Sequence, residues 1–171
     1  MRNCLTIASA VIVLMVAAAA ASAATVPPGD GWGIINRNTI GAADATLRTG
    51  PGIPPFGAGS LNLSVATGSD KIAYGDEVDF VGLRIADITA LGFSVLTTGE
   101  NFAINPTNLP NISLEVDPNV TTANYSSLVY NPAAVAPNVW STIDATRGAG
   151  WYFTNGPTAA ATGCGQNDTG T

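Results

Sequence analysis

Glu115 and Asp117 stand two residues apart in the segment NISLEVDPN, where apolar and polar residues alternate until Pro118. Side chains two residues apart on a strand share one face, so both carboxylates would point away from the apolar residues. Such a pair can act as acid and base, bind calcium, or accept hydrogen bonds from a sugar. It can also be the solvated face of a sheet. The alternation predicts a strand, and we treat Glu115 and Asp117 as ligand-binding candidates.

A second acidic group consists of Asp70, Asp76, Glu77 and Asp79. Calcium takes six to eight oxygen ligands and often obtains them from acidic loops. The spacing does not match the D-x-[DN]-x-[DN]-G loop of helix–loop–helix calcium sites. The group is therefore either a calcium site of another kind or a solvated loop, and we expect no other cofactor.

Aromatic residues are concentrated in the segment VWSTIDATRGAGWYFTN, which is typical of a β-hairpin. If its aliphatic residues face the core, Trp140 and Asp144 face solvent. If Trp151 and Phe153 also face the core, Tyr152 between them faces solvent and would lie beside Trp140. An aromatic pair next to a carboxylate suits a sugar, because rings stack on it and the acid accepts from hydroxyls. The alternative is a register shifted by one residue, which would bury Trp140.

The chain has no histidine, which excludes Ser-His-Asp and Cys-His catalysis and nearly all catalytic zinc sites. Of its two cysteines, Cys4 precedes the first apolar run and Cys164 lies near the end. Cys4 would be removed with the signal peptide described below, which leaves Cys164 as the single cysteine of the exported domain. A single cysteine in such a domain suggests a missing partner. We expect that partner beyond Thr171, with a thiol or an intermolecular disulfide as the alternatives.

Residues 1–24 have the pattern of a signal peptide: a positive start, an apolar run over 5–20 and Ala-Ser-Ala before the cleavage site. A membrane anchor is the alternative, but the run is short and is followed by two prolines. Residues 25–171 would then form one secreted, extracellular domain, truncated at its C-terminal end.

Charge limits the partners of this domain. The chain has six basic and twelve acidic residues, and loss of Arg2 with the signal peptide would leave a net charge of −7. Such an acidic chain is a poor partner for nucleic acid or for anionic lipid. We therefore expect no nucleic acid and, after cleavage, no membrane.

Short runs of β-branched and aromatic residues alternate with turn signals, which predicts an all-β fold. We expect an antiparallel jelly-roll sandwich with Greek-key connections, because several connections are long. Pro- and Gly-rich loops are expected at 49–59 and 131–138, and one helical turn at 86–91. The expected strands lie within residues 31–36, 43–50, 59–68, 78–84, 91–98, 111–118, 125–132, 139–146 and 150–155.

The stretch LEVDP resembles part of the E-x-D-x-x-E strand of the jelly-roll glycoside hydrolases that cleave β-glucans. The resemblance implies that Glu115 is a nucleophile and that Asp117 sets its protonation. The third position falls on Val120, and Pro118 ends the strand early. The acid/base of that family is therefore missing.

Over about Trp32 to Asn155, strand patterns such as GSLNLSVATGSDKIAY and YSSLVYNP resemble a secreted bacterial β-sandwich module. That module is similar to concanavalin/laminin-G-like and carbohydrate-binding domains. The resemblance implies a non-catalytic domain that binds carbohydrate or another cell-surface or matrix component. A purely structural or adhesive module and a hydrolase relative without its acid/base are the alternatives.

Overall fold

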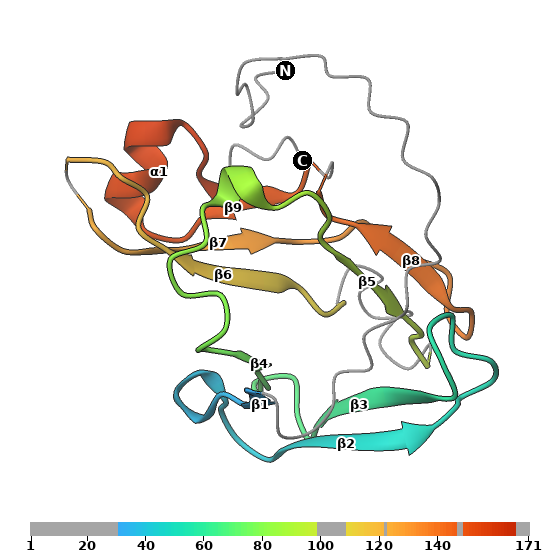
Figure 1. Ribbon diagram of the computed structural model, residues 1–171. Coiled ribbons are helices and arrows are strands. Elements are labelled where there is room, and N and C mark those ends of the chain that lie inside the picture. Colours follow the sequence, from blue (N-terminus) through green and yellow to red (C-terminus); the bar gives the residue numbers. More distant parts are fainter. Residues whose placement is uncertain (1–30, 99–108, 122, 147–148, 167–171) are drawn as a thin grey trace, which may run out of the picture. The chain divides into compact units, whose positions relative to one another are not determined.

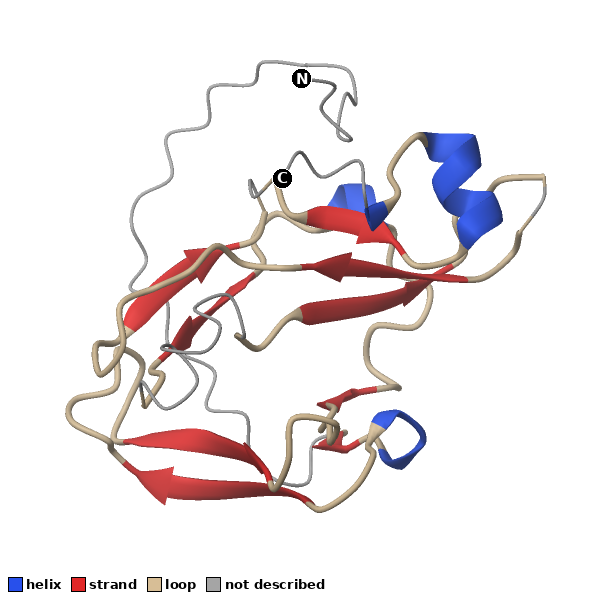
Figure 2. Ribbon diagram, turned by 180° about the vertical axis from the view of Figure 1, so that it is seen from behind, coloured by secondary structure: helices blue, strands red, loops and turns tan. Residues whose placement is uncertain are grey.

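The computed structural model describes residues 31–98, 109–121, 123–146 and 149–166. The expected signal peptide, residues 1–24, lies outside this part of the chain. The described residues belong to two compact units, 31–87 and 88–166. Both consist mainly of short strands and loops, and every pair of named strands is antiparallel (Figures 1 and 2). The expected all-β class is confirmed.

The described strands fall in every expected segment except 78–84. The first unit holds β1 (Trp32–Ile34), η1 (Asn36–Asn38), β2 (Ala43–Thr49), β3 (Gly59–Val65), β4 (Tyr74–Asp76) and η2 (Ile85–Asp87). The second unit holds β5 (Gly92–Val95), β6 (Ile112–Val116), β7 (Ser126–Tyr130), β8 (Ser141–Asp144), β9 (Trp151–Phe153) and α1 (Gly156–Thr162).

Strands β2 and β3 form a hairpin closed by the loop 50–58, which lies within the expected loop. Their register places the aliphatic side chains of both strands on one face, as the alternation predicted. This face is partly open to solvent, because Leu47 is 49% and Val65 42% exposed. Alternation predicts which side chains share a face, but not whether another element covers it.

Strands β1 and β4 form a second two-stranded sheet, with Trp32 opposite Asp76. The strand predicted over 78–84 is wrong, because these residues form successive turns. The Oδ1 atom of Asp76 accepts hydrogen bonds from the amides of Val78 (2.7 Å) and Asp79 (2.9 Å). A carboxylate that binds the next backbone amides offers them an alternative to a sheet ladder, so the strand ends at Asp76.

The core of the second unit lies between the sheets β5–β8 and β6–β7–β9. The buried side chains are Val95, Tyr130, Ile143, Ala145 and Trp151. The rings of Tyr130 and Trp151 are 5.2 Å apart, and the Trp151 indole donates to the carbonyl of Ala145 at 2.8 Å. A buried indole N–H needs such an acceptor, so this bond fixes the orientation of the ring.

The predicted hairpin between β8 and β9 is wrong: β8 pairs with β5, and β9 pairs with β7. The chain leaves the β5–β8 ladder at Thr146, whose amide donates both to Leu91 O at 3.1 Å and to Asp144 Oδ1 at 2.9 Å. It then meets the other sheet at Gly150, whose carbonyl accepts from the amide of Asn131 at 3.0 Å. A Cβ atom at Gly150 would lie 2.2 Å from Asn131 O, so only glycine allows this approach.

Helix α1 was not predicted. Asn155 is its N-cap and accepts from the amide of Thr158 at 3.2 Å, and a proline stands in the first turn. Gly163 ends the helix with a φ of 69°, a left-handed conformation that favours glycine. Among the described residues, no helix has the length and apolar character needed to cross a membrane.

Candidate functional site

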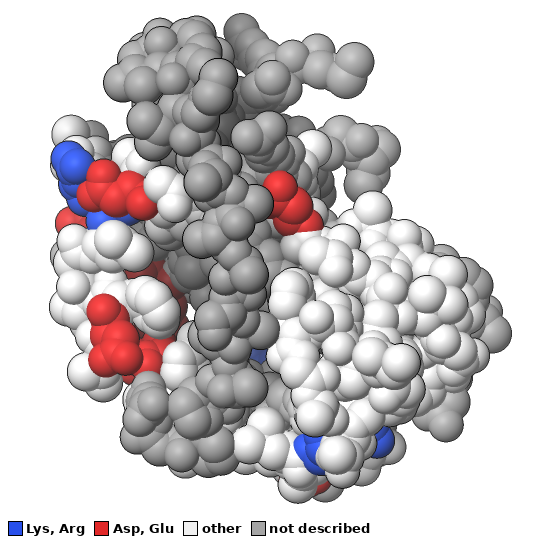
Figure 3. Space-filling model, turned by 45° about the vertical axis from the view of Figure 1, so that its right-hand side comes forward, with Lys and Arg blue, Asp and Glu red and all other residues white. Residues whose placement is uncertain are grey.

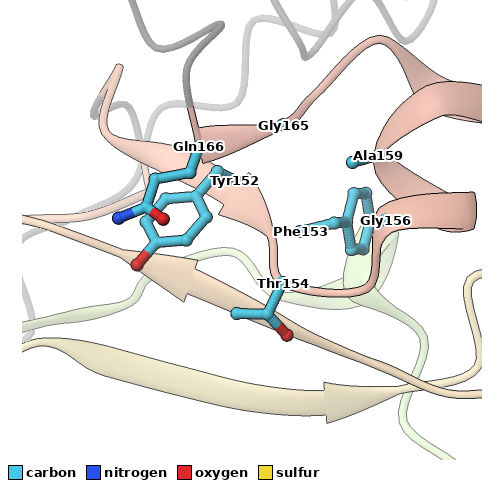
Figure 4. Close-up of a pocket in the computed structure, with 7 residues that line it drawn as sticks. All are labelled: Tyr152, Phe153, Thr154, Gly156, Ala159, Gly165 and Gln166. Carbon is cyan, nitrogen blue, oxygen red and sulfur yellow. The ribbon is translucent and has the colours of Figure 1, made fainter.

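A hollow of about 420 Å³ lies in the second unit, where β9 leads into α1. Its lining comes from the end of β9, from the helix and from the segment that follows the helix (Figure 4). The lining residues are Tyr152, Phe153, Thr154, Gly156, Ala159, Gly165 and Gln166. Its volume lies within the range of small-molecule sites, roughly 300–1,000 Å³.

Strand β9 supplies two aromatic rings from opposite faces of the sheet. Tyr152 pairs with Val129, on the face opposite Trp151 and Phe153, as predicted. Tyr152 is buried and Phe153 is half-buried. Figure 4 shows the Phe153 ring on the side of Gly156 and the Tyr152 ring toward Gln166.

Small helix residues leave the space that forms the hollow. Gly156 and Ala159 are the two residues of α1 that line it, and neither has a side chain beyond Cβ. The helix is anchored by Thr158, which is fully buried. A larger residue at either lining position would fill the hollow.

The segment after α1 returns to the sheet and brings Gln166 into place. The amide of Phe153 donates to Cys164 O at 2.8 Å, and Phe153 forms a parallel bridge with Gly165. Cys164 is buried beneath this return. Gln166 follows directly, so its amide side chain sits at the end of the hollow that Tyr152 lines.

The hollow offers hydrogen bonds without charge. Its lining residues include the hydroxyl-bearing Tyr152 and Thr154, the amide-bearing Gln166 and the aromatic Phe153, and none of the seven is Asp, Glu, Lys, Arg or His. The Thr154 hydroxyl lies 3.4 Å from Ser127 O and remains exposed. Such a surface suits an uncharged ligand that has both an apolar face and hydroxyl groups.

Of the aromatic hairpin candidates, Tyr152 lines the hollow, whereas Trp140 and Asp144 do not. Asp144 is exposed at the end of β8, and Trp140 is half-buried just before that strand. The predicted pairing of Trp140 with an exposed Tyr152 is wrong, because it required a β8–β9 hairpin and Tyr152 is buried.

Glu115 lies opposite Ser127 on the face of β6–β7 that points away from the core, as the alternation predicted. Asp117 follows the strand, and its Oδ1 accepts from the amide of Asn119 at 2.9 Å. Asn119 has a φ of 51°, so Asp117 stabilises a tight turn. The paired neighbour β7 has no acidic residue that could serve as the missing acid/base.

The structure does not bring the second acidic group together around one point. Asp70 accepts from the amide of Thr67, Glu77 pairs with Arg37, and Asp76 holds the turn to Asp79. Within the described ranges, no three Asp, Glu, His or Cys side chains are placed to hold a metal ion.

Sequence reasoning missed Phe153 as a lining residue, and it also missed the polar half of the hollow, Thr154 and Gln166. The signals were nonetheless in the sequence. Asn155 followed by a proline and closed by Gly163 is a helix start and stop, which predicts that the chain turns back at this point. No feature of Gln166 itself indicated that it would meet β9.

No protein-family model, curated protein or solved structure matches this chain. Inference about function therefore starts from the side chains that the fold brings together.

Proposed function

We propose that this chain is an exported, non-catalytic binding module that binds neutral carbohydrate in the hollow between β9, α1 and Gln166. The observation that supports this proposal is the composition of the lining: two aromatic residues, one of them a tyrosine, together with a threonine and a glutamine, and no Asp, Glu, Lys, Arg or His. Sugars present C–H faces that stack on rings and hydroxyls that pair with amides and hydroxyls.

The proposal includes a jelly-roll β-sandwich for residues 25–171, after removal of residues 1–24. The support is the number of short strands, the strict alternation in β3 and β6, and non-local strand pairing such as β5 with β8. A plain meander would pair successive strands, whereas β8 and β9 pair with earlier ones.

The test is calorimetric titration of the protein with a panel of neutral disaccharides: cellobiose, maltose, lactose and chitobiose. For any sugar that binds, Gln166→Ala and Thr154→Val should each weaken affinity about three- to tenfold, because each removes one hydrogen-bonding group. Thr142→Val is the matched control, since Thr142 is an exposed strand threonine outside the hollow.

The proposal fails if none of the sugars binds. It also fails if a sugar binds but neither Thr154→Val nor Gln166→Ala has a lower affinity for it than the control Thr142→Val. Far-UV circular dichroism of each variant shows whether the fold is kept.

A further inference from the structure

The first unit carries a loop of exposed apolar side chains, residues 78–83, which we call the apolar loop. Val81 is 82%, Val78 69% and Phe80 57% exposed, and Leu83 is also exposed. Single exposed apolar residues are ordinary, but several in one short loop form a patch of the kind found at interaction sites.

Hydrogen bonds hold the apolar loop in one conformation. Asp76 Oδ1 accepts from the amides of Val78 and Asp79, and the amide of Leu83 donates to Phe80 O at 3.1 Å. The Phe80 ring packs edge-on against Trp32, with ring centroids 6.3 Å apart. A loop that is already ordered loses little conformational entropy when it binds, which favours a role in recognition.

Acidic residues surround the apolar loop. Asp79 lies within it, and Asp76 and Glu77 precede it directly. No Lys or Arg occurs in residues 72–83. The first cation after the loop, Arg84, is held by Asp87 in a two-point pair with both distances 2.8 Å. Arg37 pairs with Glu77, so the negative charge next to the apolar side chains comes mainly from Asp76 and Asp79.

This charge selects the kind of partner. An anionic membrane would meet like charge at the loop, and so would a second copy of this chain, whose net charge is −6. On the face shown in Figure 3, the acidic and basic side chains of the described residues occur in a few small groups. We propose that the apolar loop docks onto a different protein, at an apolar surface flanked by Lys and Arg.

The test uses a fluorescent peptide of alternating Lys and Leu as a probe of that chemistry, with binding followed by fluorescence anisotropy. Val81→Ser should weaken binding about tenfold, the value expected when one buried valine contact is lost. Ile53→Ser is the matched control: Ile53 is 90% exposed in a different loop of the same unit, and the substitution leaves the charge unchanged. A peptide of alternating Glu and Leu should bind neither the unaltered chain nor the two variants.

Several results would overturn the proposal. The Lys–Leu peptide could fail to bind, or Val81→Ser and Ile53→Ser could bind it equally. The loop could instead bind vesicles of phosphatidylcholine and phosphatidylglycerol, or sedimentation could reveal a self-associating chain that Val81→Ser makes monomeric. Sugar binding in the hollow should be unchanged by Val81→Ser, so this test and that of the proposed function succeed or fail separately.

Discussion

At the scale of single residues, Trp151 connects the two sheets of the second unit. It lies on β9, packs against Tyr130 of β7 and donates its indole proton to Ala145, directly after β8. Ala145 is fully buried, so its carbonyl has no access to water as an alternative donor.

Trp151→Phe should lower the free energy of unfolding by about 1–3 kcal/mol, because it leaves this buried carbonyl without its donor and removes ring volume. Urea unfolding followed by far-UV circular dichroism measures the change. Tyr125→Phe is the control: Tyr125 is half exposed, and its substitution should change stability by less than about 0.5 kcal/mol. Equal effects of the two substitutions would contradict this role of Trp151.

At the scale of elements, the local sequence pattern predicted the positions and faces of the strands better than it predicted which strands pair. The alternation in residues 112–116 predicted that Glu115 lies on the outer face of its strand, and the structure confirms this. The prediction that Tyr152 lies on the face opposite Trp151 and Phe153 is also confirmed. The partners of β8 and β9 were not predictable in this way, because tertiary packing chooses among strands of similar pattern. Of the residues that line the hollow, only Tyr152 was therefore predicted as a ligand-binding candidate.

Helix α1 positions the polar half of the hollow, so its cap should affect binding. Asn155→Ala should destabilise the helix by about 1 kcal/mol, because it removes the side-chain acceptor for the Thr158 amide. Hydrogen exchange at the Gly163 amide, which donates to Ala159 O, should accelerate, and sugar affinity should fall. Asn155→Asp keeps a capping oxygen and should behave like the unaltered chain. Equal exchange rates in both variants would rule out the cap as the cause.

The turn that holds the apolar loop should respond to acid. The amide of Asp79, and next that of Val78, lowers the pKa of the Asp76 carboxyl below its usual value of 3.8. A lowered pKa in the folded state means that the stabilisation is complete above the unfolded-state pKa and is lost as the pH falls through the folded one. Amide chemical shifts of Val78 and Asp79 should therefore change below pH 3.8.

Asp76→Asn is the control for this titration. The asparagine amide does not ionise, so the acid-dependent change at Val78 and Asp79 should disappear. A midpoint at or above 3.8 in the unaltered chain would contradict the hydrogen bonds as the cause of the shift.

At the scale of the whole molecule, charge separates the two proposed interactions. The chain has twice as many acidic as basic residues, yet none of them lines the hollow. Raising NaCl from about 0.05 M to about 0.5 M should leave neutral sugar binding nearly unchanged and weaken binding of the Lys–Leu peptide several-fold, because salt screens exposed charges. If sugar binding and Lys–Leu peptide binding had the same salt dependence, the assignment of one of them to its site would be contradicted.

The central proposal is that neutral sugar binds where β9, α1 and Gln166 meet. The most direct test is a titration of the isotope-labelled chain with the neutral disaccharides, followed by NMR. We predict that shifts concentrate at the backbone amides of Thr154 and Gly165 and at the side-chain amide of Gln166. No shift with any of the sugars, or shifts confined to residues outside the hollow, would contradict it.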